Sequence, residues 1–320
     1  METAEGRNGT LIMEFILLGF GNDPELQPLL FFMFLVIYLV TLAGNLLILV
    51  LVMADQHLHT PMYFFLGNLA CLEICYTSTI LPRFLTSLLT GNRSVSVKGC
   101  IVQLYFFAVM GTTENLLLTA MSYDRYLAIC HPLRYAALMN SRVCMKLVAG
   151  SWISSCLGIT IVNNFLFRLT FCHSNEIDHF FCEFVPMIEL SCSDTQIVQL
   201  LGFVVAVLGA LVPFLLTLVS YVCIISAILR IPSNIGRQKA FSTCSSHLIV
   251  VTLYYVIVIA VYLVPIVSTG KVDQKIFSVF CTVLTPMVNP VIYCLRNKEV
   301  KESLRKAICK LVALRNRHRI

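Results

Sequence analysis

Asp124-Arg125-Tyr126 lies where the third of seven long apolar stretches of this chain ends. Two charged side chains beside a phenol are costly to place next to lipid, so their position at the end of an apolar helix needs a reason. The reason would be an arginine that its neighbouring carboxylate holds in one state and releases toward a partner in another. The tripeptide therefore predicts a switch at the cytoplasmic end of a membrane helix.

The composition also places the rest of the chain in a membrane. Hydrophobic residues make up 58% of the chain and charged residues 12%, whereas a soluble domain carries about 25% charged residues. A helix needs about 20 apolar residues to span a bilayer, and Glu73 and Glu114 are the only formal charges inside the seven stretches that qualify. We therefore predict an all-α membrane protein, a seven-transmembrane helix bundle. The predicted spans are residues 29–53, 62–81, 101–121, 147–167, 197–229, 248–267 and 276–295.

Lysine and arginine predict the orientation of these spans. Residues 1–28 hold no convincing cleavable signal peptide, because their apolar stretch is short and is broken by Glu14. With the N-terminus outside, the inner segments carry 16 of the 23 basic residues and the outer segments carry seven. We therefore expect a multi-pass plasma-membrane protein with an extracellular N-terminal tail (1–28), a seven-transmembrane domain (29–295) and a cytoplasmic tail (296–320).

The predicted outer segments carry chemistry typical of the cell exterior. Asn8 begins an Asn-Gly-Thr glycosylation sequon. Four cysteines lie on the outer side, where disulfides persist, and four cysteines allow three connectivities. We favour Cys100–Cys182, which would tie an outer loop to the third span, and with it Cys172–Cys192.

The predicted cytoplasmic tail has an amphipathic pattern. Apolar and basic side chains alternate at helical spacing, which predicts a short helix lying on the anionic inner leaflet. Cys309 would be a site for palmitoylation there, although a free thiol fits equally well. The apolar residues are Val300, Leu304, Ala307, Ile308 and Leu311, and the basic residues are Lys298, Lys301, Arg305, Lys306 and Lys310.

Four segments, in order along the chain, match one known family. The four segments are Pro61-Met62-Tyr63-Phe64-Phe65-Leu66-Gly67-Asn68-Leu69-Ala70, Met121-Ser122-Tyr123-Asp124-Arg125-Tyr126-Leu127-Ala128-Ile129-Cys130, Lys239-Ala240-Phe241-Ser242-Thr243-Cys244-Ser245-Ser246-His247-Leu248 and Pro286-Met287-Val288-Asn289-Pro290-Val291-Ile292-Tyr293. The chain resembles the olfactory receptors of the tetrapod type (class II), a branch of the rhodopsin-like (class A) G-protein-coupled receptors. Ser122 and Leu127 replace the alanine and valine usual in this family, and Glu73 replaces an aspartate.

The resemblance implies a function. The chain would bind a small, mostly neutral volatile odorant and activate a heterotrimeric stimulatory G protein of the olfactory type, raising cyclic AMP, in the sensory cilia of olfactory neurons. It implies no cofactor, no catalytic residues and no nucleic-acid partner. The residues expected to couple to the G protein are Asp124, Arg125, Tyr126, Tyr221, His247, Asn289, Pro290 and Tyr293. His247 fits a hydrogen-bonded histidine at the membrane interface equally well.

The odorant site is expected where the outer halves of the third, fifth, sixth and seventh spans converge in this family. Phe107 occupies the position of the aspartate in amine receptors, which argues against a cationic amine as ligand. Glu183 and Phe184, directly after Cys182, would form a lid. Helical spacing gives the remaining residues, although an apolar face of this kind is also what helix packing alone requires. They are Ala108, Gly111, Thr112, Val205, Gly209, Tyr255, Val258, Tyr262, Val279 and Thr282.

Glu73 and Glu114 are two acids inside predicted spans. An unpaired carboxylate in a membrane is strongly disfavoured, so each should be protonated, hydrogen-bonded or bound to a cation. The family packs Asn45 and Asn289 into the same mid-membrane cluster. Two readings stay open, a sodium site and a pair of protonated acids that join helices; we predict no metal.

Two other classes of protein compete with this interpretation. A secondary transporter would show internal repeats with matching broken helices, and the sequence shows no such repeat. A receptor of the same build that detects a metabolite outside the nose has the same sequence features, and a ligand panel would separate it from an odorant receptor.

Overall fold

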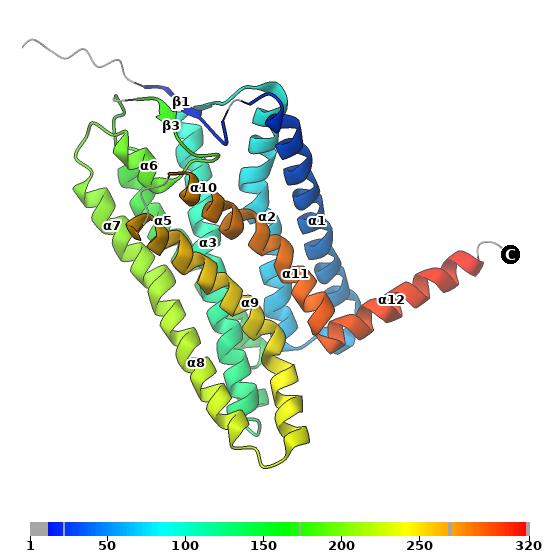
Figure 1. Cartoon of the computed structure of the whole chain (residues 1–320). Coiled ribbons are helices and arrows are strands. Elements are labelled where there is room, and N and C mark those ends of the chain that lie inside the picture. Colours follow the sequence, from blue (N-terminus) through cyan, green and yellow to red (C-terminus); the bar gives the residue numbers. More distant parts are fainter. Residues whose placement is uncertain (1–11, 22, 173, 268–270, 318–320) are drawn as a thin grey trace, which may run out of the picture.

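The structure is a computed structural model that describes residues 12–21, 23–172, 174–267 and 271–317, with backbone alone for 260–267, 271–274, 295–296 and 310–317. It confirms the predicted bundle of seven long apolar helices (Figure 1). We call the end with the N-terminal strand the outer end and the opposite end the inner end. The spans are α1 (Leu26–Ala54), α2 (Pro61–Thr90), α3 (Val97–Cys130), α5 (Ser141–Leu166), α7 with α8 (Gln196–Ala206 and Val212–Leu229), α9 (Asn234–Val267) and α10 with α11 (Lys271–Val279 and Thr285–Arg296).

Local sequence fixes where several of these helices begin and end. Pro61 stands at the start of α2, where its missing N–H costs nothing. The Ser96 hydroxyl accepts from the backbone N–H of Gly99 at the start of α3 (3.1 Å), and the Asn140 side chain does the same for α5. Gly91 ends α2 at φ 71°, the left-handed conformation that favours glycine. The helices therefore run past the apolar stretches that predicted them.

Two helices contain a π turn next to a proline. Residues Val207–Leu211 (η2) separate α7 from α8, and residues Phe280–Leu284 (η3) separate α10 from α11. Pro213 and Pro286 follow these turns, and each proline leaves the carbonyl four residues earlier without its helical partner. The wider π turn re-pairs the backbone at the cost of one inserted residue. The outer part of each helix is therefore rotated relative to a regular helix.

The outer end is closed by a small sheet that the sequence did not predict. Strand β1 (Glu14–Leu17) pairs antiparallel with β2 (Ser94–Ser96) and parallel with β3 (Glu176–Ile177), in the order β2-β1-β3. Phe15 on β1 is fully buried, and the short helix α6 (Phe184–Glu189) lies below the sheet (Figure 1). Strand β1, which precedes the first span, is thus part of the folded cap over the bundle.

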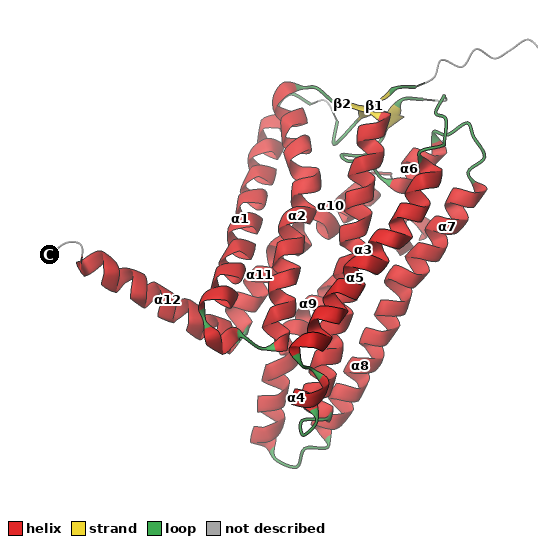
Figure 2. Cartoon of the chain, turned by 180° about the vertical axis from the view of Figure 1, so that it is seen from behind, coloured by secondary structure: helices red, strands yellow, loops and turns green. Residues whose placement is uncertain are grey.

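The inner end carries three further elements. The turn η1 (Gln56–Leu58) and helix α4 (Tyr135–Leu138) lie in connections between spans. Helix α12 (Lys298–Arg317) leaves the bundle sideways (Figure 2). Val300 is buried where α12 begins, whereas Lys301 and Arg305 are exposed. The tail therefore forms the expected amphipathic helix, although the side chains of Lys310 and Leu311 lie outside the described part.

Candidate functional site

The outer half of the bundle encloses a cavity of about 500 Å³. The cavity volume falls within the range of small-molecule sites, roughly 300–1,000 Å³. Glu183 is the one acid among the lining residues that the structure describes, and no lysine, arginine or histidine lines the cavity there. The cavity is therefore an apolar site with few polar groups.

Most of the predicted site residues line this cavity. The structure brings together residues from α3, from the loop before α6 and the start of α6, from α7 and η2, and from α9 and η3. They are Phe107, Ala108, Gly111, Thr112, Glu183, Phe184, Val205, Gly209, Val258 and Thr282.

Two predicted residues point elsewhere, and a third is not described. Tyr255 is buried against α8, where its ring meets Phe214 edge-on at 4.9 Å, and its neighbour Tyr254 lines the cavity instead. Val279 packs into the aromatic cluster under the N-terminal segment, because the π turn after it breaks the regular spacing that predicted it. The side chain of Tyr262 lies outside the described residues.

Sequence reasoning missed the contribution of α2 and α5. Tyr76 on α2 stacks on Phe107 at 5.3 Å and lines the cavity beside it. Helix α5 adds a wall of four residues, of which only Asn163 is polar. The missed residues on α5 are Ile159, Val162, Asn163 and Leu166, and the missed residues elsewhere include Asn115, Ser278 and Cys281.

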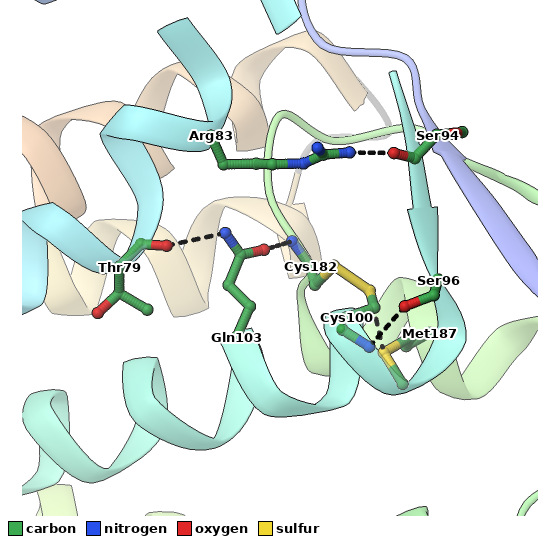
Figure 3. Close-up of a disulfide and its surroundings, with 9 residues drawn as sticks. Thr79, Arg83, Ser94, Ser96, Cys100, Gln103, Cys182 and Met187 are labelled. Atoms are coloured by element: carbon green, nitrogen blue, oxygen red, sulfur yellow. Dashed lines mark hydrogen bonds between the residues drawn. A yellow bond between two sulfur atoms is a disulfide. The ribbon is translucent and has the colours of Figure 1, made fainter. Parts of the chain in front are cut away.

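A disulfide anchors the lid of the cavity. Cys182 is bonded to Cys100 at the top of α3 (Figure 3). Glu183 and Phe184 follow Cys182 in the chain and line the cavity. The Gln103 side chain accepts from the Cys182 N–H (3.1 Å) and donates to a carbonyl of α2 (3.0 Å). A second disulfide joins Cys172 to Cys192. Both bonds follow the pairing favoured from the sequence, whereas Asn8 lies outside the described residues.

Glu183 and His179 face each other in this lid. The Nε2 atom of His179 lies 3.3 Å from Oε2 of Glu183, and His179 is 2% exposed. Desolvation by burial raises the pKa of Glu183 to about 7. Burial, and next the charge of Lys275, lowers the pKa of His179 to about 3. At neutral pH the histidine is therefore uncharged, and the carboxyl group at the cavity wall is close to its midpoint.

Buried polar side chains form a second group in the middle of the bundle. The Asn289 amide donates to Oε1 of Glu73 (2.6 Å), and the Asn45 amide donates to the Pro286 carbonyl (3.2 Å). Glu114 is 3% exposed, and its Oε1 has no hydrogen-bond partner among the described residues. The structure thus joins α1, α2 and α11 through Asn45, Glu73 and Asn289, while Glu114 stays outside these bonds.

Arg125 is held at the inner end of α3. Its Nε donates to Oδ2 of Asp124 (2.9 Å), its terminal nitrogen contacts the same oxygen, and the Tyr135 hydroxyl donates to Oδ1 (2.8 Å). Asp124 is fully buried and Arg125 is 9% exposed. The carboxylate therefore has partners on both oxygens, and the guanidinium is paired with its own neighbour in the chain.

Three of the other predicted coupling residues, Tyr221, His247 and Tyr293, lie near Arg125, whereas Asn289 belongs to the central polar group. The Tyr221 hydroxyl lies 2.6 Å from Nδ1 of His247, which links α8 to α9. Tyr293 is fully buried, and its hydroxyl has no hydrogen-bond partner in the described part of the chain. Tyr126 points away and pairs with His131 at 3.1 Å. Pro290 lies inside α11, one turn before Tyr293 along the chain.

A bundle of seven apolar helices with an outer cavity, a central polar group and an arginine held at its inner end defines a seven-helix membrane receptor. The family model described as olfactory receptor matches residues 34–311. Olfactory receptor 10A3 of Homo sapiens is 48% identical over 94% of this chain and 96% of its own length. Olfactory receptor 5M5 of Mus musculus is 47% identical over 94% and 95%, respectively. The chain therefore belongs to the olfactory receptor family, whose members are G-protein-coupled receptors and not enzymes.

Proposed function

We propose that this chain is an odorant receptor that binds small, mostly neutral volatile molecules in its outer cavity. The observation that carries this proposal is the lining: about 500 Å³ of largely apolar space with no basic side chain among the described residues. A charged ligand would lose its hydration there without gaining a counter-ion. A neutral molecule gains dispersion contacts, and hydroxyl groups such as those of Thr112 and Tyr254 offer it one or two hydrogen bonds.

The intracellular step of the proposal is activation of a stimulatory G protein of the olfactory type, which raises cyclic AMP. Arg125 supports this step, because it is nearly buried and its bonds to Asp124 are made within one helix. Breaking those bonds therefore frees the guanidinium without unfolding the bundle. Displacement of α9, which carries His247, would open the surface beside it.

The same proposal assigns the orientation. The N-terminal tail with Asn8 would lie outside, α12 would lie on the cytoplasmic leaflet, and the chain would reside in the plasma membrane of olfactory cilia. The excess of basic residues in the inner segments and both disulfides at the opposite end support this assignment. An epitope after residue 320 should be invisible to antibody on intact cells and visible after permeabilisation.

A panel of volatile compounds on cells that express the chain, with cyclic AMP as readout, tests the proposal. Val258→Trp fills the cavity and should abolish the response to every agonist. Val256→Trp is the matched control, because Val256 lies on the same helix and is 58% exposed outside the cavity. Equal losses in the two variants would refute the assigned site. Uptake of a labelled solute without a G-protein response would identify a transporter instead.

A further inference from the structure

A groove lies on the side of the bundle that would face lipid. It runs along the halves of α3, α5 and α8 that are nearer the inner end. Its volume is about 590 Å³, and none of its described lining residues lines the odorant cavity. The side chains along it face the surroundings of the bundle: Tyr123, Leu216 and Val219 are 42%, 54% and 61% exposed. In a membrane this groove opens toward the acyl chains of the surrounding lipid.

The walls of the groove offer few free polar groups to a ligand. Ser151, Ser154 and Ser220 line it, but each hydroxyl donates to a carbonyl four residues earlier in its own helix, at 2.7–2.8 Å. These hydroxyl groups therefore have their hydrogen-bond donors satisfied before any ligand enters. What the walls offer to a ligand is mainly dispersion contact.

One end of the groove carries an unpaired positive charge. Lys146 is the lining residue on α5 nearest to the start of that helix, and it is exposed. Among the described residues it makes no hydrogen bond or ion pair, whereas Lys275 at the outer end is bound to Asp178. The lining residues that the structure describes include no acid. A single cation at the end of an apolar groove is complementary to an amphiphile with an anionic head and an apolar chain.

We propose that this groove binds an anionic phospholipid, with the phosphate at Lys146 and one acyl chain between α3 and α8. The assignment to the inner leaflet rests on the proposed orientation, and that leaflet holds the anionic lipids. Lipid tails are as apolar as the walls, so burial alone gives no preference over bulk lipid. Selectivity for the anionic head must therefore come from Lys146.

Gly150 keeps the middle of the groove open. No atom outside its own helix lies within 4 Å of the position that a Cβ would take there. A Cβ at this residue therefore fits without a clash, and a larger side chain built on it would occupy the groove. Ala149 is the matched control position, because it is exposed on the same helix and does not line the groove.

The test uses the full chain in nanodiscs of phosphatidylcholine with a minor share of phosphatidylserine, each lipid in turn carrying a photoactivatable group on its acyl chain. Phosphatidylserine should crosslink to Leu216 and Val219 in preference to phosphatidylcholine. Lys146→Gln should reduce this preference about fivefold, the effect of one lysine near an anionic surface. Arg142→Gln removes an exposed cation of the same helix outside the groove and should leave the preference unchanged.

Gly150→Leu should abolish the crosslinks to α8, and Ala149→Leu should keep them. Equal crosslinking by both lipids, unaffected by Lys146→Gln, would mean that bulk lipid alone fills the groove and would overturn the proposal. Loss of the phosphatidylserine crosslinks on addition of a sterol, to the same extent with and without Lys146→Gln, would overturn the proposal as well. A nanodisc presents the lipid on both faces, so the result does not depend on the proposed orientation or on odorant binding.

Discussion

Glu183 should make agonist affinity depend on pH around neutrality. Its carboxyl group lines the odorant cavity, and burial raises its pKa to about 7. A neutral agonist covers this group more completely, which disfavours the charged form further. Binding should therefore be stronger when Glu183 is protonated, and affinity should rise as the pH falls from 8 to 6.

The magnitude follows from the pKa. A carboxyl group with a pKa of about 7 is protonated in about 90% of molecules at pH 6 and in about 10% at pH 8. If the protonated form alone binds, the apparent dissociation constant scales inversely with that fraction, so it should increase about tenfold from pH 6 to pH 8.

The stability of the folded lid should depend on pH in the same direction as agonist affinity does. Because the pKa of Glu183 is raised in the folded state to about 7, its contribution is complete below the ordinary pKa and is lost as the pH rises toward 7. His179 acts in the opposite sense, because its pKa is lowered to about 3. Its contribution is complete above the ordinary histidine pKa and is lost in acid, so it changes little between pH 7 and 8.

Equilibrium binding of a non-ionisable agonist to membranes measures the effect without the pH dependence of later signalling steps. Glu183→Gln should remove the tenfold change and keep the affinity seen at pH 6. Glu176→Gln alters an exposed acid of the same loop outside the cavity and should behave as the parent chain does. A tenfold change that persists in Glu183→Gln, or a parent chain with no change, would refute the reasoning.

Three other perturbations test separate parts of the structure. Arg125→Ala should abolish the cyclic AMP response while the receptor remains detectable at the cell surface, and normal signalling would contradict the proposed switch. Gly209→Ala places a Cβ 2.7 Å from Cγ2 of Thr112 and should lower the stability of the fold by about 1–3 kcal/mol. Adding Thr112→Ser removes that methyl group and should restore the melting temperature. Equal melting temperatures of the single and double variants would exclude the clash. Lys275→Gln removes the contacts to Asp178 and to the N-terminal segment and should weaken the outer cap by about 1 kcal/mol. The measurement is the rate of proteolysis before the first span, which should increase. An unchanged rate would show that the sheet holds the cap without Lys275.

The seven helices were predictable because membrane spans are long and their signal is local. About 20 apolar residues in a row report a span without knowledge of any distant contact. The outer sheet was not predictable for the opposite reason. Its strands are two to four residues long, and β1 reaches partners at Ser94 and Glu176 that lie far away in the sequence. Such pairing leaves no periodic pattern in the chain.

The cavity was predictable where helical spacing holds. On α3, which contains no π turn, all four predicted residues line the cavity. On the seventh span, Thr282 within the π turn lines the cavity but Val279 before it does not. A proline in the sequence indicates an irregular helix, but it does not show whether the helix is kinked or contains an inserted residue.

Two polar links between helices bear on how the cavity can act on Arg125. Below the cavity floor, the Thr119 hydroxyl on α3 lies 3.2 Å from that of Thr217 on α8. One turn further in, Tyr221 on α8 is bonded to His247 on α9. A ligand that never touches these groups changes their arrangement only if it binds the two states with different affinity. To raise an active fraction from 1% to 50% it must prefer the active state about 100-fold, or about 2.7 kcal/mol. One neutral hydrogen bond contributes about 1 kcal/mol, so under the proposed mechanism dispersion contacts must differ between the two states too. Under this mechanism the side chains able to supply that difference are those on η2 and α9, because η2 continues into α8 and the Tyr221–His247 bond joins α8 to α9.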